Sequence, residues 1–319
     1  MKSIGQVRAA LPQAFLDRLS SFFPQDIQEK ILAGYGQERP VTLRANTLKT
    51  SVRDLMGELG EAGVKYDRVL WYPDALIVKN RREKELSELP AYREGRLYLQ
   101  SLSSMVPALV LAPQPGERVL DVSAAPGSKT TQLAALMRNQ GRILANDLNP
   151  LRVERLKHNL RVQGVDIAEV SRQDGRHLGR LFPEAFDRVL LDAPCSGEGL
   201  FSASSPLTYR HWSPENVRRL ASLQRKLFSA AYLALRPGGT LVYSTCTLAP
   251  EENELVVAWA LQEFAGHLET APSPLALPEA APPLTQVERR ILPPQVQRAF
   301  RLLPARNFEG FFVCLFRKT

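Results

Sequence analysis

Two cysteines of this chain lie where a parallel α/β sheet presents reactive groups. Cys195 belongs to the segment Asp-Ala-Pro-Cys-Ser-Gly at 192–197, and Cys246 belongs to Tyr-Ser-Thr-Cys-Thr at 243–247. Each segment follows a short apolar run that predicts a buried strand. Because such a sheet gathers functional groups at the carboxyl ends of its strands, we expect both thiols to face one crevice.

A pair of thiols in a crevice suits covalent catalysis on a pyrimidine base. A thiolate that adds to C6 of cytosine or uracil turns C5 into an enamine-like nucleophile, which can accept a methyl group from a sulfonium. A base then removes the C5 proton, and elimination frees the enzyme. Asp192 stands where it could hydrogen-bond N3 and N4 of the ring. The third cysteine, Cys314, lies in an apolar run, and we expect it to be a core residue.

The residues themselves leave open which thiol attacks. DNA cytosine-5 methyltransferases use a cysteine in a Pro-Cys pair after the fourth strand, which would favour Cys195. Both candidates directly follow a strand and lie among small polar residues, which argues against a purely structural role for either. The residues around the two cysteines do not indicate which thiol attacks the base and which assists release of the product.

A turn of small residues lies upstream in the same predicted sheet. The strand at 118–122 runs into Ser-Ala-Ala-Pro-Gly-Ser-Lys-Thr at 123–130, which opens a helix and lets a ligand approach the backbone. The spacing is neither Gly-x-Gly-x-x-Gly nor a phosphate-binding P-loop. Asp147, Asp174 and Asp192 end further strands, where carboxylates can bind ribose hydroxyls or an ammonium group. We therefore predict S-adenosylmethionine as cofactor; aspartates that only cap helices are the alternative.

Composition limits the class of protein. The 319 residues are 44% hydrophobic and 23% charged, which is typical of a soluble globular protein. We expect no membrane segment and no signal peptide, and the three scattered cysteines favour a reducing cytoplasm. The four histidines lack metal-ligand spacing, so we expect no metal. The net charge of +8 fits a polyanionic partner such as RNA, although a solvated basic surface explains it equally well.

The pattern of apolar residues predicts two domains. Residues 1–96 combine a helical stretch at 8–35 with an α+β unit, whose helix at 51–62 begins at the N-cap Ser51. Residues 97–319 start with a helix at 102–111, and strands then alternate with helices, which predicts a parallel sheet. The proline- and alanine-rich stretch at 270–295 predicts an irregular surface loop. The strands expected at 40–48, 69–71, 75–78, 118–122, 142–146, 168–171, 188–191, 240–243 and 310–317 complete the scheme.

Long ordered motifs resemble the NOL/NOP/Sun family of RNA cytosine-5 methyltransferases. They are Leu-Asp-Val-Ser-Ala-Ala-Pro-Gly-Ser-Lys-Thr at 120–130, Asp-Ala-Pro-Cys-Ser-Gly-Glu-Gly at 192–199, Tyr-Ser-Thr-Cys-Thr-Leu at 243–248 and Glu-Glu-Asn-Glu at 251–254. The likeness extends to Arg-Ala-Asn-Thr-Leu-Lys at 44–49, to 100–105 and to Gly-Phe-Phe at 310–312, so it spans nearly the whole chain. Among members, the chain is most similar to bacterial RsmF-type enzymes, which modify 16S ribosomal RNA.

The resemblance implies a class I, Rossmann-like methyltransferase with a mostly parallel seven-stranded sheet, preceded by a small α+β RNA-binding domain. It implies that Cys246 attacks C6 and that Cys195 assists release of the product. The cofactor contacts it implies are Ala124, Ala125, Pro126, Gly127, Ser128, Lys129, Asp147, Arg152, Asp174 and Asp192. In the N-terminal module, Arg44, Asn46 and Lys49 are candidate RNA contacts, with a plain solvated strand as the alternative. Ser128 departs from the second glycine found in many members, and Ser123 from a frequent cysteine.

Several substrate classes stay open at this stage. The expected reaction is formation of 5-methylcytosine in ribosomal RNA, with transfer RNA as the alternative. A target base must leave its stack to reach the thiols, and Tyr209, His211 and Trp212 could stack on it, although Trp212 could equally pack at the start of the helix that begins near Pro214. Asp-Ala-Pro-Cys differs from the Asn/Asp-Pro-Pro-aromatic motif of amino-group methyltransferases. A largely non-catalytic ribosome-assembly factor is the alternative from another class, and we expect a monomer.

Overall fold

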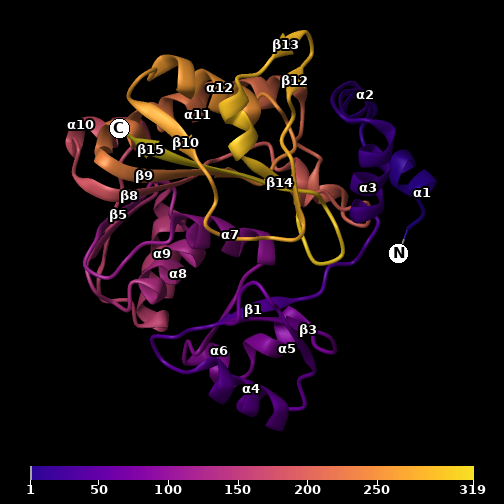
Figure 1. The fold of residues 1–319 in the computed structure, drawn as a ribbon. Coiled ribbons are helices and arrows are strands. Elements are labelled where there is room, and N and C mark those ends of the chain that lie inside the picture. Colours follow the sequence, from indigo (N-terminus) through magenta and orange to yellow (C-terminus); the bar gives the residue numbers. More distant parts are fainter. Residues whose placement is uncertain (1) are drawn as a thin grey trace.

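The computed structural model describes residues 2–319 and shows a central sheet with helices on both faces and a smaller sheet unit below it (Figure 1). The central sheet has the strand order β11-β14-β15-β9-β8-β5-β6-β7, with β10 paired to β15. Its strands are β5 (Arg118–Asp121), β6 (Arg142–Asn146), β7 (Ala168–Ser171), β8 (Phe186–Asp192), β9 (Leu235–Thr245), β10 (Leu268–Ala271), β11 (Ala280–Ala281), β14 (Phe300–Leu302) and β15 (Phe311–Lys318). The strands β7, β6, β5, β8 and β9 are parallel neighbours, whereas β15 returns antiparallel to β9.

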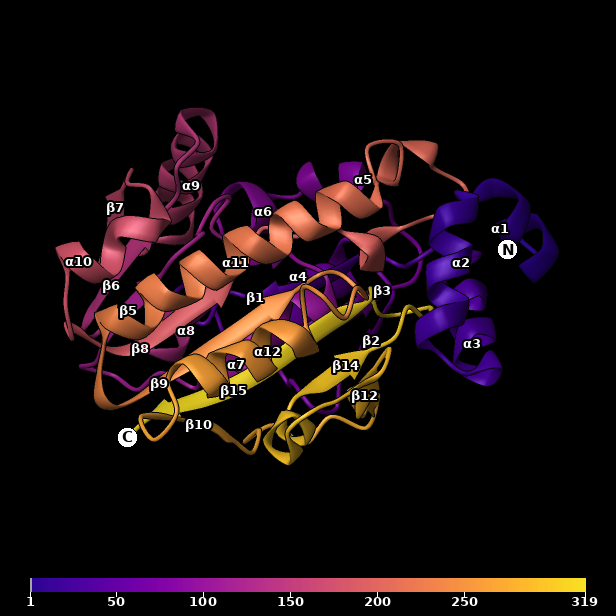
Figure 2. The same ribbon diagram turned by 90° about the horizontal axis from the view of Figure 1, so that it is seen from above.

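Successive residues of the strands point to opposite faces of this sheet, and both faces are apolar. On β8, Val189 and Leu191 pack into the core under α11 and α12, while Leu190 packs into the core on the side of α7 and α8. Figure 2 shows α11 and α12 lying across β8, β9 and β15. The helices are α7 (Leu102–Leu111), α8 (Ser128–Leu136), α9 (Pro150–Gln163), α10 (Leu178–Leu181), α11 (Pro214–Ala234) and α12 (Glu254–Glu263).

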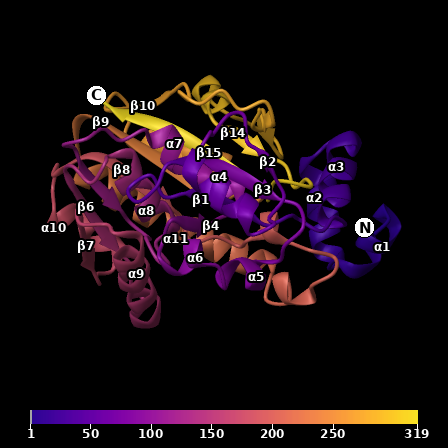
Figure 3. The same ribbon diagram turned by 90° about the horizontal axis from the view of Figure 1, so that it is seen from below.

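The smaller unit is a four-stranded antiparallel sheet of order β2-β3-β1-β4 (Figure 3). Its elements are β1 (Thr42–Ala45), α4 (Val52–Glu61), β2 (Tyr66–Arg68), β3 (Ala75–Val78), α5 (Glu83–Ser87), α6 (Pro90–Arg93) and β4 (Leu97–Leu99). The Ser51 side chain accepts a hydrogen bond from the Asp54 amide, as its predicted N-cap role requires. The strand expected at 69–71 is wrong, because β2 pairs with β3 three residues earlier and 69–71 forms the following turn.

The first three helices pack on the central domain and not on the small sheet. These helices are α1 (Ile4–Ala10), α2 (Gln13–Phe22) and α3 (Gln25–Tyr35), and they divide the helical stretch expected at 8–35. Phe15 and Tyr35 form one apolar cluster with Phe201, Tyr209 and Leu248 of the central domain. The N-terminal helices therefore cover the loops that follow β8 and β9.

The predicted mostly parallel class I architecture is confirmed, with two corrections. The central sheet in residues 2–319 has nine strands and not seven. The stretch at 270–295 is also not wholly irregular, because it holds the end of β10, the strand β11, and the hairpin of β12 (Gln286–Val287) and β13 (Arg290–Ile291). Strands of two residues are held by backbone pairing and leave no alternation in the sequence, so pattern alone misses them. The remaining short helices are η1 (Gly175–His177), η2 (Glu198–Leu200), η3 (Pro206–Thr208) and η4 (Pro294–Arg298).

Candidate active site

The two candidate thiols meet at the carboxyl edge of β8 and β9. These strands are parallel neighbours, with Asp192 opposite Ser244 in register. The loops that continue from them bring Cys195 Sγ and Cys246 Sγ to 3.1 Å from each other. Both thiols are partly exposed, whereas Cys314 is buried on β15. The expected convergence of two thiols in one place is thus what the fold produces.

The protonation state of Cys195 follows from its surroundings. The contact with Cys246, burial, and the nearby carboxyl of Glu252 all raise the pKa of Cys195 well above its usual range, with the Cys246 contact as the largest cause. Two thiols this close cannot both ionise easily, because a second negative charge would face the first across the contact. Cys195 is therefore held as a protonated thiol.

Asp192 is held in place between a lysine and a serine. Its Oδ2 lies 2.8 Å from Lys129 Nζ, and its Oδ1 accepts a hydrogen bond of 2.7 Å from Ser244 Oγ. Lys129 Nζ also donates to Ser104 Oγ at 2.8 Å and lies over the Phe311 ring. Lys129 therefore comes from the small-residue turn but is directed at the carboxylate beside the thiols, which joins the two halves of the site.

Further polar contacts tie the two thiol loops to each other. Ser196 Oγ and Thr247 Oγ1, which follow the two cysteines directly, lie 2.7 Å apart. The Gly199 amide donates to the carbonyl of Cys246 at 2.9 Å, so the chain after Cys195 folds back onto Cys246. These contacts fix the separation of the two loops from both sides.

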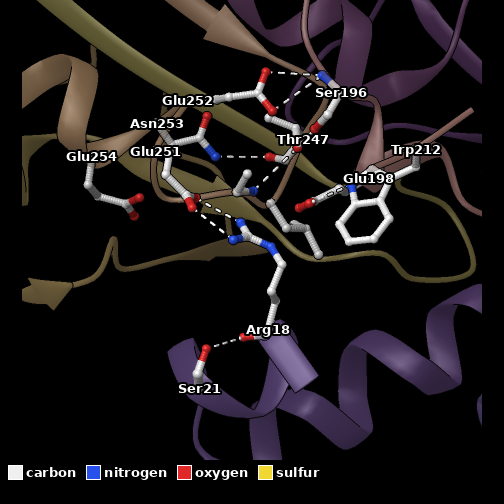
Figure 4. A network of polar contacts seen from close by, with 12 residues as sticks. Arg18, Ser21, Ser196, Glu198, Trp212, Thr247, Glu251, Glu252, Asn253 and Glu254 are labelled. Carbon is white, nitrogen blue, oxygen red and sulfur yellow. Dashed lines mark hydrogen bonds and ion pairs between the residues drawn. The ribbon is translucent and has the colours of Figure 1, made fainter. Parts of the chain in front are cut away.

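Buried carboxyl groups surround these loops (Figure 4). Glu252 accepts hydrogen bonds from the Ser196 amide, and burial raises the pKa of Glu252 to about 8. Glu198 accepts a hydrogen bond of 3.0 Å from Trp212 Nε1, and burial raises the pKa of Glu198 to about 7. Glu251 instead faces α2, where Arg18 pairs with it through two contacts of 2.8 Å.

The small-residue turn follows β5 and is fixed by its own backbone. Gly127 has a φ of +108°, a conformation that favours glycine, and its amide donates to the Ala124 carbonyl at 2.8 Å. Asn159 Nδ2 donates to the Pro126 carbonyl at 2.8 Å, and Arg152 Nη2 donates to the Ala125 carbonyl. The predicted turn residues thus form one connected loop at the start of α8.

Asp147 has the features expected of a ligand-binding carboxylate. It ends the region of β6 and is 4% exposed, and its Oδ1 accepts a hydrogen bond from the Asn149 amide. In residues 2–319, its Oδ2 has no hydrogen-bond partner, although Arg152 Nη1 lies 3.3 Å from it. This oxygen thus has an ion-pair partner but accepts no hydrogen bond, and a buried carboxylate oxygen gains from a further donor. The hydroxyl groups of a ribose would supply that donor.

Asp174 differs from Asp147 because its carboxylate already has partners. It caps η1 by accepting from the Arg176 amide at 3.0 Å, and it pairs with the Arg176 guanidinium. These contacts lower the pKa of Asp174 to about 2. For Asp174, the capping role weighed as the alternative is present in the structure.

Arg44 and Asn46, expected to contact RNA, are buried, and that expectation is corrected. Arg44 Nε donates to Gln100 Oε1 at 2.9 Å and its Nη2 to Thr131 Oγ1 at 2.6 Å, while Asn46 Nδ2 donates to the Gly95 and Gln163 carbonyls at 2.8 Å. These contacts connect the small sheet to α8 and α9. Lys49 is exposed, but its Nζ donates to the Glu94 and Val162 carbonyls, so all three residues bind protein groups.

Of the aromatic residues proposed to stack on a base, two also pack against other protein side chains. Tyr209 is 9% exposed and packs on Phe201, and Trp212 packs edge-on against Phe15 of α2. Only His211 of the three is exposed, with Arg210 Nε at 2.7 Å from its Nε2. Trp212 is thus a packing residue, but it packs on α2 and Phe201 and not, as the alternative held, at the start of α11.

Three further residues of the site were not singled out as functional candidates from the sequence. Asp121 ends β5, accepts a hydrogen bond of 2.7 Å from Thr130 Oγ1, and has its pKa raised to about 7 by burial. Gln224 and Glu252 hold the chain at Cys195 from α11 and from the loop before α12. The Glu-Glu-Asn-Glu segment was a usable signal for Glu252, whereas Gln224 lies in an ordinary helical pattern with nothing to mark it.

Within residues 2–319, no group of three or more His, Cys, Asp or Glu side chains is arranged to hold a metal ion. No helix in that described part of the chain is long and apolar enough to cross a bilayer.

The parallel sheet, the small-residue turn and the strand-end carboxylates define the class I methyltransferase fold. The chain belongs to the family described as 16S rRNA methyltransferase RsmB/F, which matches residues 108–317. Residues 11–83 match the ferredoxin-like domain of RsmF/B-like methyltransferases. These matches confirm the resemblance that the motifs indicated.

Individual relatives agree with this assignment. The chain is 39% identical to Ribosomal RNA small subunit methyltransferase F of Cronobacter sakazakii over 100% of the chain and 65% of that protein. It is also 39% identical to the protein of the same name from Escherichia coli O81 over 97% of the chain and 63% of that protein. Thus the chain spans about two thirds or less of the length of these curated relatives. A methyltransferase homolog from Pyrococcus horikoshii superposes with a TM-score of 0.86 at 35% identity, covering 99% of this chain and 98% of the other.

Proposed function

We propose that this protein is an S-adenosylmethionine-dependent RNA methyltransferase that forms 5-methylcytosine in ribosomal RNA. The observation that carries the proposal is the pair of thiols at 3.1 Å, on the sheet edge that also holds the small-residue turn. The names of the relatives, which are small-subunit ribosomal RNA methyltransferases, support ribosomal RNA as the substrate.

The residues of the turn fit the proposed cofactor. When bound, S-adenosylmethionine supplies an electrophilic methyl group on a sulfonium. The Oδ2 of Asp147, which is ion-paired with Arg152 but accepts no hydrogen bond, suits the ribose hydroxyls. The backbone from Ala124 to Ser128 provides a close approach at the start of α8. Arg152 keeps the turn and Asp147 together through contacts to both, whereas Asp174 and Lys129 are already paired with Arg176 and Asp192.

The two thiols divide the covalent chemistry between them. Cys246 is proposed as the nucleophile, whose sulfur bonds to C6 of cytosine and so loads negative charge onto C5. Once Cys246 is bonded to C6, its charge no longer opposes ionisation of Cys195, which can lose its thiol proton to water. The Cys195 thiolate then takes the C5 proton after methylation, and the electron pair of that C–H bond reforms the C5–C6 double bond as Cys246 leaves as a thiolate. The likeness to the family supports this division of roles, because the resemblance assigns the attack on C6 to Cys246. Asp192, fixed by Lys129 and Ser244, is proposed to bind the N3–N4 edge of the base.

A basic groove supports RNA as the partner. A groove of about 760 Å³ lies between the small sheet and the loop before β15. Arg39, Lys79, Arg81, Arg82 and Arg306 line it, against the acidic side chains of Glu38, Asp67 and Glu85. Lys79 pairs with Asp67 and Arg81 with Glu85, which leaves Arg39, Arg82 and Arg306 against Glu38. The remaining positive charge attracts phosphates irrespective of base sequence. Transfer RNA is the second candidate substrate, because these features favour any folded RNA.

Methyl transfer from labelled S-adenosylmethionine tests this proposal. Separately prepared ribosomal subunits, ribosomal RNA and transfer RNA are each incubated with the protein, and the labelled nucleosides are then identified. Label in 5-methylcytidine from small-subunit RNA is the expected result, while label in transfer RNA alone would move the substrate to the second candidate. Binding of the cofactor without label in any pool would instead favour a ribosome-assembly factor.

A further inference from the structure

Gln224 is a buried side chain on α11 whose amide reaches the loop of Cys195. Its Nε2 donates to the Pro194 carbonyl at 3.0 Å and to Glu252 Oε2 at 2.7 Å. Both hydrogens of the amide nitrogen are thus used, one on the backbone before Cys195 and one on a carboxyl group. Gln224 is 0% exposed, so water does not compete for these bonds.

Glu252 contacts the backbone on the other side of the same cysteine. Its Oε2 accepts a hydrogen bond of 3.0 Å from the Ser196 amide, and Glu252 is itself 0% exposed. The residue is anchored in turn, because Tyr243 Oη donates to its carbonyl at 2.6 Å. Gln224 and Glu252 therefore form hydrogen bonds to the two peptide groups that flank Cys195, the carbonyl before it and the amide after it. We call this pair of contacts, together with the Gln224–Glu252 hydrogen bond, the grip.

This grip also relates Cys195 to the loop of Cys246. Glu252 lies in the segment that follows Cys246 in the chain, and Ser196 Oγ meets Thr247 Oγ1 at 2.7 Å. A shift of Glu252 relative to Pro194 would change the distance between the two thiols. Gln224 makes the connection rigid because it contacts both.

We propose that Gln224 and Glu252 are positioning residues that hold the Cys195 thiol against Cys246, and that they act on product release and not on methyl transfer. The inference rests on the proposed function, in which Cys195 assists elimination. Neither side chain is assigned contact with the base or the cofactor. Misplacing an assisting group by about 1 Å can slow its step by about 100-fold.

The protonation of Glu252 indicates which substitution should preserve the grip. With a pKa of about 8, the Glu252 carboxyl is largely neutral at pH 7, and a glutamine there keeps the shape and one acceptor oxygen. Glu252→Gln is therefore the conservative variant, whereas Glu252→Ala and Gln224→Ala each remove one half of the grip. Glu251→Ala is the matched control, because that neighbouring carboxylate pairs with Arg18 and not with the loop of Cys195.

The experiment separates the first turnover from release. Each variant of the full chain is mixed with labelled S-adenosylmethionine and the RNA pool that the wild type methylates, and the methyl transferred in the first turnover is measured. The denaturant-resistant protein–RNA adduct is measured in the same samples. For Glu252→Ala and Gln224→Ala we expect adduct to accumulate about tenfold or more above wild type, with unchanged first-turnover methylation and unchanged kcat/KM. Glu252→Gln at pH 7 and Glu251→Ala should match the wild type.

Two results would overturn the inference. Normal release by both alanine variants would show that the grip is dispensable. An equal loss of first-turnover methylation and of release would show a general structural effect. Thermal unfolding of each variant is recorded. If Glu252→Ala does not fold, the inference is judged on the results for Gln224→Ala alone.

A measurement without turnover keeps this inference separate from the proposed function. In a Cys246→Ser background, iodoacetamide alkylates Cys195, and peptide mass spectrometry gives the rate. Adding Gln224→Ala should raise that rate several-fold because the loop is freed, and an unchanged rate would count against the grip. If the wild type methylates no RNA, the proposed function fails while this rate still tests the positions of Gln224 and Glu252.

Discussion

Cys195 and Cys246 are separated by 51 positions in the chain, yet their Sγ atoms lie 3.1 Å apart. The two thiols lie close together because β8 and β9 pair in parallel, so that both strands end at the same edge of the sheet. Residues next to each cysteine then join the loops through the Ser196–Thr247 contact. Two thiols in contact invite different roles, because only one of them can readily carry a negative charge.

Removing the proposed nucleophile should abolish the reaction. We expect Cys246→Ala to lower methyl transfer by about 1,000-fold or more while leaving the cofactor affinity unchanged, because no cofactor-turn residue is altered. Methyl transfer and calorimetric binding of S-adenosylmethionine measure the two effects. Cys314→Ala serves as the control, since that thiol lies in the core, and normal turnover by Cys246→Ala would refute the assignment.

Removing the other thiol should stall the reaction after the adduct has formed. In Cys195→Ala the Cys246–C6 bond can still form, but the group proposed to assist elimination is absent. A protein–RNA band that resists denaturant should therefore build up in gel electrophoresis with labelled RNA. Full turnover without such a band would remove Cys195 from the mechanism.

Asp147 provides a test of the cofactor site. Its Oδ2, which accepts no hydrogen bond within the chain, is the buried oxygen proposed to meet the ribose, and a hydrogen bond to a charged group contributes about 1.5–3 kcal/mol. Asp147→Ala should accordingly weaken binding of S-adenosylmethionine by about 10- to 100-fold in calorimetry. Glu154→Ala is the control, because Glu154 is exposed on α9 and pairs only with Lys157. Equal affinities in the two variants would exclude a ribose contact at Asp147.

The sequence predicted the elements that repeat a pattern. The strands at 142–146 and 168–171 and the helix at 102–111 have the predicted bounds, and Pro113 and Pro115 mark the end of that helix in the sequence. The convergence of the two cysteines was predictable for the same reason, since strand ends in a parallel sheet share one edge.

Residues that join separate parts of the fold could not be predicted in this way. Arg44 and Asn46 look like exposed groups of a strand, and only the docking of β1 on α8 and α9 buries them. Gln224 reaches the loop of Cys195 from a helix whose pattern is that of any amphipathic helix. Such contacts depend on how elements pack, and one sequence carries no local signal for that.

The burial of Arg44 changes what its substitution should do. Its guanidinium joins β1 to Gln100 and Thr131, so Arg44→Ala should lower the free energy of unfolding by about 2–4 kcal/mol, measured with urea. Arg53→Ala, on the exposed side of α4, is the control and should change it by less than about 0.5 kcal/mol. Unchanged stability together with lost RNA binding would restore the original expectation of an RNA contact.

Glu198 predicts a loss of stability as the pH rises. Burial raises its pKa from 4.5 to about 7, so the folded protein keeps a proton that the unfolded chain releases near pH 4.5. Between these values the unfolded state binds fewer protons, and the free energy of unfolding falls with increasing pH by an amount on the order of 2–3 kcal/mol. Glu198→Gln keeps an acceptor for Trp212 and removes this ionisation. Urea unfolding at pH 5 and pH 8 should show that Glu198→Gln gains stability over wild type at the higher pH, whereas exposed Glu154→Gln shows no such gain. A Glu198→Gln difference that is the same at both pH values would mean that Glu198 ionises in the folded protein as it does in the unfolded chain.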